Sequence, residues 1–181
     1  MKKILFLGLA AAGLGLGACS SSGSEEWPAG VITRNDFENV QGWGGANEAG
    51  VTTEKARSGK YSICVNPQTE FSYTYIRQLG QMSSGKPKKL TVTAWAWVPD
   101  KDAKASLILE IKHSPEKGTQ VLYDGTELSS TVRSFKSWEQ VTKTYVLPDS
   151  VAAANVVKLY IWRGSSPRPV YMDDVSIKVE N

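Results

Sequence analysis

The 181-residue chain is poor in the side chains on which many hydrolases and transition-metal sites depend. It has one histidine, His113, and two cysteines. A single histidine cannot form a histidine-based metal site, and no Gly-x-Ser-x-Gly turn is present to support a hydrolase triad. The Glu-x-Asp-x-Glu run that many β-sandwich glycosidases place on one strand is also absent. These absences predict a protein that is not an enzyme.

Long apolar runs are missing except at the N-terminus. Lys2 and Lys3 precede an apolar run over 4–16, which is shorter than the roughly 20 residues of a membrane span and is typical of a secretory signal. The run ends in Leu16-Gly17-Ala18-Cys19, which resembles the lipobox of bacterial lipoproteins. The resemblance implies that residues 1–18 are a lipoprotein signal peptide and that Cys19 receives the lipid.

Residues 19–30 are then expected to be the lipidated cysteine and a flexible tether, because the segment is rich in small and polar residues. Ser20 follows the cysteine where an aspartate would favour the inner membrane. The pair Glu25-Glu26 is similar to the acidic export signals of Bacteroidota surface lipoproteins. We expect an outer-membrane lipoprotein of the cell envelope. The acidic pair favours display on the cell surface. Other envelope proteins are a further class of expected partner.

Neither sign of charge dominates once the signal segment is removed. Loss of Lys2 and Lys3 reduces 21 basic residues to 19, against 18 acidic ones. A nearly neutral protein has no field that would favour nucleic acid or an anionic membrane surface as partner. With Cys19 carrying lipid, Cys64 is the remaining thiol, so an intramolecular disulfide and a cysteine-based metal site are excluded. Cys64 lies in an alternating run and is expected to be a small buried hydrophobe.

Residues 31–181 carry no long amphipathic helical pattern and are expected to form one domain. β-Branched and aromatic residues recur in short segments that turn residues separate. The predicted strands are 61–65, 71–78, 90–98, 106–113, 139–147, 156–163 and 170–179. The one helix-like piece, 150–155, is too short to change the class. This pattern predicts an all-β protein, an antiparallel β-sandwich.

An ordered set of motifs in this domain resembles the carbohydrate-binding modules of families 4, 9 and 22. The motifs are Asn35-Asp36-Phe37-Glu38, Gly42-Trp43, Ser58-Gly59-Lys60-Tyr61-Ser62, and the segments 90–95, 138–141, 145–148 and 170–177. The resemblance covers nearly all of the mature chain and implies a galactose-binding-like jelly roll. Because this fold hosts binders of many ligands, it favours a glycan without identifying one.

The resemblance also implies a structural calcium ion, Ca2+. In such modules the ion is held by an acidic residue near the first strand, by main-chain oxygens after the Ser-Gly turn, and by an aspartate of the last strand. The matching positions are Glu38, the carbonyl of Lys60, and Asp173, and oxygen ligands suit calcium. Alternation places Asp173 on the inward face of its strand, where its charge would need a partner. In the alternative, the two carboxylates face water or pair with arginine.

The strand predicted over 90–98 alternates strictly between two kinds of side chain. Its aliphatic row is expected to face the core, which leaves Trp95 and Trp97 on the outer face. Two indoles about 6 to 7 Å apart along a strand form a platform on which a sugar can stack. Two alternatives stay open: the tryptophans form the buried row, or the aromatic face is covered by a loop or another subunit.

The segment 157–162 repeats this arrangement, with Tyr160 and Trp162 on the face opposite its aliphatic residues. In 106–112 the charged residues Glu110 and Lys112 are expected on the outer side. If these strands share one sheet with Trp95 and Trp97, aromatic rings lie beside charged groups. That mixture suits a carbohydrate, whose C–H faces stack on rings while its hydroxyls bond to charged groups.

The remaining aromatic residues divide less clearly. The row Phe71, Tyr73, Tyr75 and Arg77 could be core aromatics that end in an arginine, or a second stripe of the same cleft, with Arg77 as a polar contact. We expect Trp43 and Trp138 to pack in the core. Tyr123 belongs to a segment, 118–127, expected to be a loop that could close over a ligand. Lys112, His113 and Tyr160 could in principle serve a polysaccharide lyase, but alternation turns His113 toward the core.

We therefore expect a lipid-anchored, non-catalytic module that binds a polysaccharide or oligosaccharide through an aromatic platform on one sheet face. The expected ligand-binding residues are Trp95, Trp97, Tyr160, Trp162, Glu110, Lys112 and Arg77. The alternative is a structural or protein-interaction lipoprotein with the same fold. A glycan cleft should show exposed rings flanked by polar groups, whereas a protein contact should show a flatter, continuous apolar patch.

Overall fold

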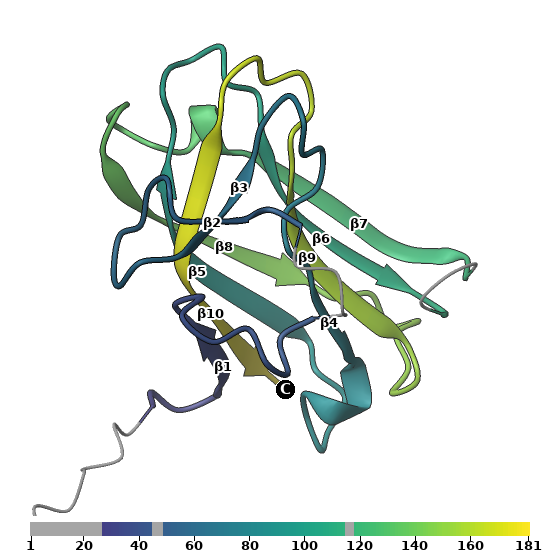
Figure 1. Ribbon diagram of the computed structural model, residues 1–181. Coiled ribbons are helices and arrows are strands. Elements are labelled where there is room, and N and C mark those ends of the chain that lie inside the picture. Colours follow the sequence, from purple (N-terminus) through teal and green to yellow (C-terminus); the bar gives the residue numbers. More distant parts are fainter. Residues whose placement is uncertain (1–26, 45–48, 115–117) are drawn as a thin grey trace, which may run out of the picture.

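The computed structural model describes residues 27–44, 49–114 and 118–181, so the expected signal peptide, Cys19 and most of the tether lie outside the described residues. The described residues form ten strands and two short 3₁₀ helices (Figure 1). They are β1 (Val31–Asn35), β2 (Val51–Thr52), β3 (Ser62–Val65), β4 (Tyr75–Gln78), η1 (Leu79–Gln81), β5 (Lys89–Trp97), β6 (Ser106–Lys112), β7 (Gln120–Glu127), η2 (Leu128–Ser130), β8 (Trp138–Val146), β9 (Val156–Trp162) and β10 (Val170–Glu180).

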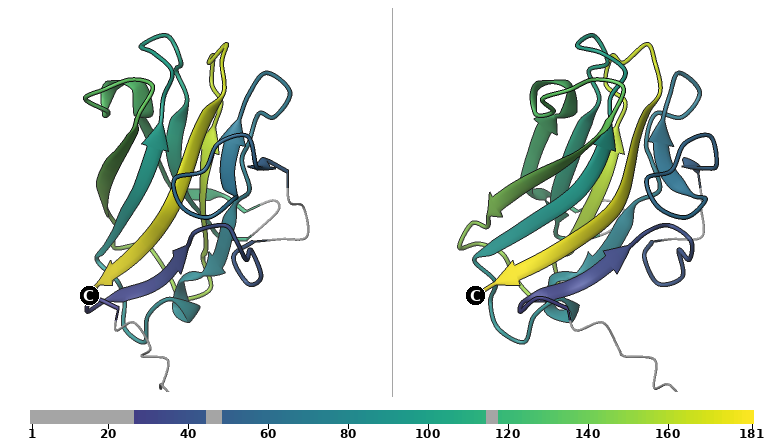
Figure 2. Two further views of the ribbon diagram at one scale, coloured as in Figure 1. Left: turned by 60° about the vertical axis from the view of Figure 1, so that its left-hand side comes forward. Right: turned by 90° about the vertical axis from the view of Figure 1, so that its left-hand side faces the viewer.

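The strands form two antiparallel sheets that pack face to face, as the side views in Figure 2 show. The six-stranded sheet has the order β2-β3-β10-β5-β8, and β1 also pairs with β10, beyond the stretch of β10 that β3 occupies. The four-stranded sheet has the order β4-β9-β6-β7. All strand pairs are antiparallel, so the predicted antiparallel β-sandwich is confirmed.

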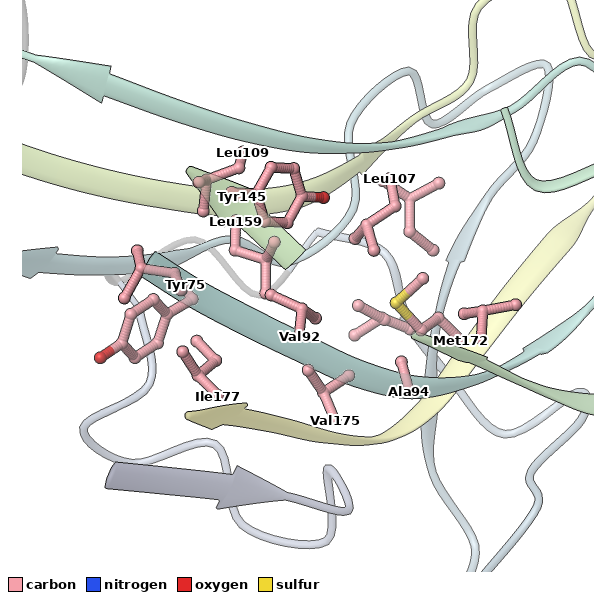
Figure 3. Packing of buried hydrophobic residues seen from close by; sticks show 14 of the residues in the cluster. Tyr75, Val92, Ala94, Leu107, Leu109, Tyr145, Leu159, Met172, Val175 and Ile177 are labelled. Carbon is pink, nitrogen blue, oxygen red and sulfur yellow. The ribbon is translucent and has the colours of Figure 1, made fainter. Parts of the chain in front are cut away.

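The core lies between the sheets and follows the alternation of the strands. In β5 the residues Leu90, Val92, Ala94 and Ala96 are fully buried, whereas Trp95 and Trp97 on the other face are half-buried. In Figure 3 side chains of β5 and β10, including Val92 and Ile177, face Leu107, Leu109 and Leu159 of the opposite sheet. The aliphatic row of β5 is therefore the core row, as predicted, and the alternative with buried tryptophans is wrong.

Three strands were not expected from the sequence. β1 and β2 add to the six-stranded sheet, and β7 occupies most of the segment 118–127 that was expected to be a loop. Residues 150–155 form turns rather than a helix. Among the described residues, no helix combines the length and apolar character needed to cross a bilayer.

Individual burial expectations were met in part. Trp43 and Cys64 are buried, as predicted, and burial raises the pKa of the Cys64 thiol to about 11. Trp138 is only half-buried, because it pairs directly with Trp97 across β5 and β8 and so lies on the outer face; the expectation that it is a core residue was wrong. His113 lies just beyond the end of β6 and is exposed, because the alternation of the strand no longer applies there.

Candidate functional site

The predicted aromatic residues do not form one platform. Trp95 and Trp97 belong to β5 of the six-stranded sheet, whereas Tyr160 and Trp162 belong to β9 of the four-stranded sheet. In both strands the aromatic side chains point away from the core, so the two pairs lie on opposite outer faces of the sandwich. Alternation predicted the correct face of each strand, but the platform built from both strands is wrong.

The 53–61 loop packs over the tryptophans of β5. The guanidinium of Arg57 lies 4.0 Å from the centre of the Trp95 ring, and the ammonium of Lys55 lies 4.3 Å from that of Trp97. Tyr171 of β10 contacts Trp97 edge to face at 5.7 Å. Cations over ring faces stabilise the loop and occupy the surface on which a sugar would stack. Covering by a loop is one of the alternatives that the sequence left open.

The outer face of the four-stranded sheet brings together the other predicted residues. Tyr160 pairs with Ile108 across β9 and β6, and Glu110 pairs with Lys158 on one side and Tyr123 on the other. Glu110, Tyr160 and Trp162 therefore face the same side, as predicted. Lys112 joins them through an ion pair of 2.8 Å between its Nζ and Glu110 Oε1.

Aromatic side chains are unusually exposed on this face. Phe71, Tyr123 and Trp162 are 48%, 44% and 37% exposed, although they are large and apolar. Phe71 forms an isolated bridge with Trp162, and its ring contacts Tyr160 at 5.8 Å with an angle of 74° between the planes. We call the four rings of Phe71, Tyr123, Tyr160 and Trp162 the aromatic face. Exposed apolar groups gathered in this way mark a binding surface more often than a solvent face.

A hollow of about 230 Å³ lies beside these rings. Its walls are formed by Phe71, Thr74, Ile76, Glu110, Lys158 and Tyr160. Glu110 is only 7% exposed, so its carboxylate is held in a largely dehydrated position by the surrounding side chains. Burial, and then the negative charge of Glu110, raise the pKa of the Tyr160 phenol. Tyr160 therefore stays neutral and can donate a hydrogen bond, while Glu110 can accept bonds from hydroxyl groups.

Arg77 does not belong to this face. It pairs with Val157, whose side chain is in the core, and it shares the inner row of β4 with the buried Tyr75. Its guanidinium lies 5.9 Å from the Tyr75 ring and donates to the carbonyl of Ile76. Tyr73, Tyr75 and Arg77 therefore form the core row, which ends in an arginine. The prediction that Arg77 contacts a ligand on the outer face was wrong.

The sequence did not assign two residues, Phe71 and Tyr123, to the aromatic face. Phe71 precedes β4, and the irregular segment between them breaks the alternation that would have grouped it with Tyr75. Tyr123 lies on a strand rather than on a closing loop. Gly125 weakens the strand pattern of β7. A glycine fits at this position because the Cβ atom of any other residue would lie 2.8 Å from Cδ1 of Ile108.

The three predicted calcium ligands meet at the 53–61 loop. Glu38 Oε1 accepts hydrogen bonds from the backbone N–H groups of Lys60 and Tyr61, at 2.6 and 2.7 Å. Asp173 Oδ2 accepts from the N–H groups of Arg57 and Ser58. The two carboxylates therefore bind successive parts of one loop, and neither faces only water.

Asp173 reaches this loop because β10 contains a bulge. Asp173 pairs with Trp95, and the register shifts before Ser176, with Asp174 at a φ of 48°. The extra residue reverses the alternation, so Asp173 lies on the outer side of the sheet with Trp95. The expectation that it shares the inward face of Val175 was wrong. The loop buries it completely, and this burial raises its pKa to about 6 although three backbone N–H groups favour the carboxylate.

The carboxylates of Glu38 and Asp173 supply oxygen atoms at the 53–61 loop, and oxygen is the ligand type that calcium prefers. Among the described residues, however, no three His, Cys, Asp or Glu side chains lie close enough together to share a metal ion. Calcium held between Glu38 and Asp173 would therefore need main-chain oxygens such as the carbonyl of Lys60. Asp174 instead pairs with Arg57 at 2.7 Å and accepts from Ser58 Oγ.

The strands form a jelly-roll sandwich, and one of its outer sheet faces carries the aromatic face. The chain belongs to a family of carbohydrate binding domains, the CBM 4/9 family, whose sequence profile matches residues 29–169. Carbohydrate-binding modules are non-catalytic domains, and this chain is one of them. No curated protein matches the sequence.

Solved structures of carbohydrate-binding modules share the fold at low sequence identity. The CBM22-1 xylan-binding domain of Paenibacillus barcinonensis Xyn10C has 17% identity and a TM-score of 0.53, covering 82% of this chain and 94% of that domain. The C-terminal family 22 module of Clostridium thermocellum Xyn10B has 16% identity and a TM-score of 0.56, covering 86% and 98%. A second module of family 16 has 15% identity and a TM-score of 0.53, covering 81% and 97%. At this identity the likeness establishes the fold.

Proposed function

We propose that this protein is a lipid-anchored module of the bacterial cell envelope that binds a glycan chain on the aromatic face. The observation that carries the proposal is the gathering of Phe71, Tyr123 and Trp162, all exposed, on the same sheet face as the buried carboxylate of Glu110. Rings supply stacking surfaces for the C–H faces of sugars, and Glu110, Lys112 and Lys158 supply acceptors and donors for hydroxyls. A protein contact would favour a flatter and more continuous apolar patch.

The angles between the rings favour a single glycan chain as ligand. The planes of Phe71 and Tyr160 differ by 74°, so a flat crystalline surface cannot stack on both. A free chain can turn between successive sugars and meet each ring in its own orientation. Three of the structural neighbours are described as xylan-binding domains, so xylan is the first chain to test.

A binding assay with matched variants tests the site. Soluble xylan and a panel of other polysaccharides are presented to the wild-type protein, to Phe71→Ala and to Phe135→Ala. Phe135 is 40% exposed and does not line the hollow beside Tyr160, so it is a control for the loss of a surface phenylalanine. We expect Phe71→Ala to weaken binding by about tenfold or more, or ~1.4 kcal/mol, because the chain loses a stacking partner. Equal binding by all three proteins would overturn the proposed site.

The lipid anchor rests on the N-terminal sequence. Lys2, Lys3 and the apolar run before Leu16-Gly17-Ala18-Cys19 support processing as a lipoprotein, and 19–30 supply a tether to β1. Ser20 supports the outer membrane as the location, and Glu25-Glu26 supports display on the cell surface. An anchored module of this kind would hold glycan chains near the envelope or present them to envelope protein partners.

Calcium is proposed as a structural ion at the 53–61 loop. Glu38 and the buried Asp173 would hold it together with the carbonyl of Lys60, and the ion would supply positive charge to a carboxylate that lacks a cation partner among the described contacts. Because the ligands come from both ends of the chain, binding would stabilise the joining of β1 to β10.

A further inference from the structure

The outer face of the six-stranded sheet carries its own cavity, on the side opposite the aromatic face. The cavity has a volume of about 580 Å³, larger than the hollow beside Tyr160 and within the range of small-ligand sites. Its lining includes Trp27 and four charged residues, Arg34, Asp36, Arg57 and Asp174. Trp27 is 44% exposed at one end, and the guanidinium of Arg34 lies 5.8 Å from its ring.

A second hollow of about 430 Å³ adjoins this cavity. Gln140 lines both hollows, and Trp95, Trp138 and Arg133 also line the second one. Arg57 lines the first hollow and Trp95 the second, and these two side chains stack on each other at 4.0 Å. The two hollows therefore adjoin across β10, β5 and β8, on either side of the Arg57–Trp95 stack, and together we call them the second groove.

The floor of the second groove is a row of hydroxyl and amide groups. Ser176, Thr93 and Thr142 pair side by side across the three strands, and the hydroxyls of Thr93 and Thr142 lie 3.2 Å apart. Gln140 continues this row at the next level, opposite Trp95. Hydroxyls and amides each donate and accept hydrogen bonds, which suits a ligand covered with hydroxyl groups.

The charges along the groove balance. In the first hollow Arg34 and Arg57 face Asp36 and Asp174, and in the second Arg133 lies with Glu139. No excess of one sign is available to attract an anionic chain, so the complementary ligand is uncharged. Trp27 lines the first hollow and Trp138 the second, where the ring of the neighbouring Trp95 is covered by Arg57. The lining thus combines ring faces with balanced polar groups.

We propose that the second groove binds a neutral oligosaccharide or a neutral stretch of a polysaccharide. The chain contacts Trp27 and Trp138 through its C–H faces and bonds through its hydroxyls to the floor and to the arginines. This site is independent of the aromatic face, because the two lie on opposite sides of the sandwich. A module with two such faces joins two glycan chains, or binds one folded chain with increased avidity.

The indole N–H signals of the tryptophans allow each face to be observed separately by NMR. Trp27, Trp95 and Trp138 report on the second groove, Trp162 on the aromatic face, and the buried Trp43 serves as an internal control. The purified protein and its Tyr160→Ala variant are titrated with soluble xylo-, cello-, laminari- and manno-oligosaccharides, and signals are assigned by single Trp→Phe variants. We expect saturable shifts at Trp27, Trp95 and Trp138 that persist in Tyr160→Ala, with Trp43 unchanged.

Each outcome decides between the two sites. Shifts at Trp162 alone support the aromatic face and overturn the second groove. Shifts at the groove tryptophans that disappear in Tyr160→Ala also overturn it, because they would be transmitted from the other face. Absence of any shift with the whole panel overturns the groove as a neutral-glycan site. A Trp27→Ala variant should weaken groove binding by about tenfold or more while leaving the Trp162 shifts unchanged.

Discussion

At the scale of single residues, identical alternation leads to different surroundings. Trp95 and Trp162 both point away from the core of their sheets, but Arg57 covers the ring of Trp95, whereas Trp162 keeps 37% of its surface exposed. The difference comes from a loop distant in sequence, since the 53–61 loop packs over β5 and not over β9. Exposure of a strand residue is therefore set by what packs over its face.

Glu38 is the residue at which the calcium proposal can be tested. Its carboxylate touches the loop where Gly59 leaves room for it, because a Cβ at Gly59 would come within 2.4 Å of Glu38. We expect calcium at ~100 times its Kd to stabilise the protein by about 2.7 kcal/mol, which raises Tm by roughly 5 to 10 °C. The chelator EDTA should reverse the rise, and Glu38→Gln should remove most of it. Thermal unfolding followed by circular dichroism measures both effects.

The control for this measurement is magnesium, which prefers a stricter geometry and should raise Tm less. A Tm that is the same with calcium and with EDTA would contradict the proposal. A calcium effect of equal size in Glu38→Gln would show that the ion binds elsewhere.

At the scale of elements, Glu127 joins three parts of the chain. Its Oε1 accepts bonds at 2.8 Å from Lys104, before β6, and from Ser129 and Ser130 of η2. Lys104 first, then Ser129 and Ser130, lower the pKa of Glu127 from 4.5 to about 2. Because the folded pKa is lowered, the stabilisation is present above about 4.5 and is lost as the pH falls toward 2.

We therefore expect Glu127→Gln to reduce the free energy of unfolding by about 1 kcal/mol at neutral pH, a small value because the pair with Lys104 is partly exposed. The difference from the wild-type protein should shrink as the pH falls from about 4.5 to about 2. Urea unfolding over a series of pH values measures it. A difference that stays constant over this range would show that the ionised carboxylate is not what stabilises these elements.

Other elements show why the sequence predicted some strands and not others. β5, β6, β9 and β10 are long and alternate, and they pair in the middle of the sheets, where one face must be buried. β2 has two residues, and β7 lies at an edge and contains Gly125, so neither carries a strong pattern. The bulge in β10 is also not visible as a pattern, and it turned Asp173 to the unexpected face.

At the scale of the whole molecule, the two outer faces point in opposite directions, and the proposed tether would join at β1, which lies beside β10 in the six-stranded sheet. Figure 1 shows β1 and the C-terminus near each other at the same end of the sandwich. A module tethered at this end exposes both sheet faces along its sides.

Cys19→Ala tests the anchor. Produced in a Gram-negative host, the wild-type protein should fractionate with membranes, because acyl chains hold an otherwise soluble domain. The variant should instead be found in the soluble fraction. Mass spectrometry of the N-terminal peptide should show acyl chains on Cys19 only in the wild-type protein. Cys64→Ala is the control for loss of a thiol, and its recovery in the soluble fraction would contradict a role for Cys19 alone.

The sequence by itself determined the fold class, the core row of each long strand and the outward direction of Trp95, Glu110, Tyr160 and Trp162. It could do so because successive side chains of a strand point to opposite faces, so a strand with one buried face has an apolar residue at every second position. Which sheet a strand joins is a matter of long-range pairing, and alternation carries no information about it. Only the tertiary structure could therefore separate Trp95 and Trp97 from Tyr160 and Trp162, cover the first pair with the 53–61 loop, and bring Phe71 and Tyr123 to the second.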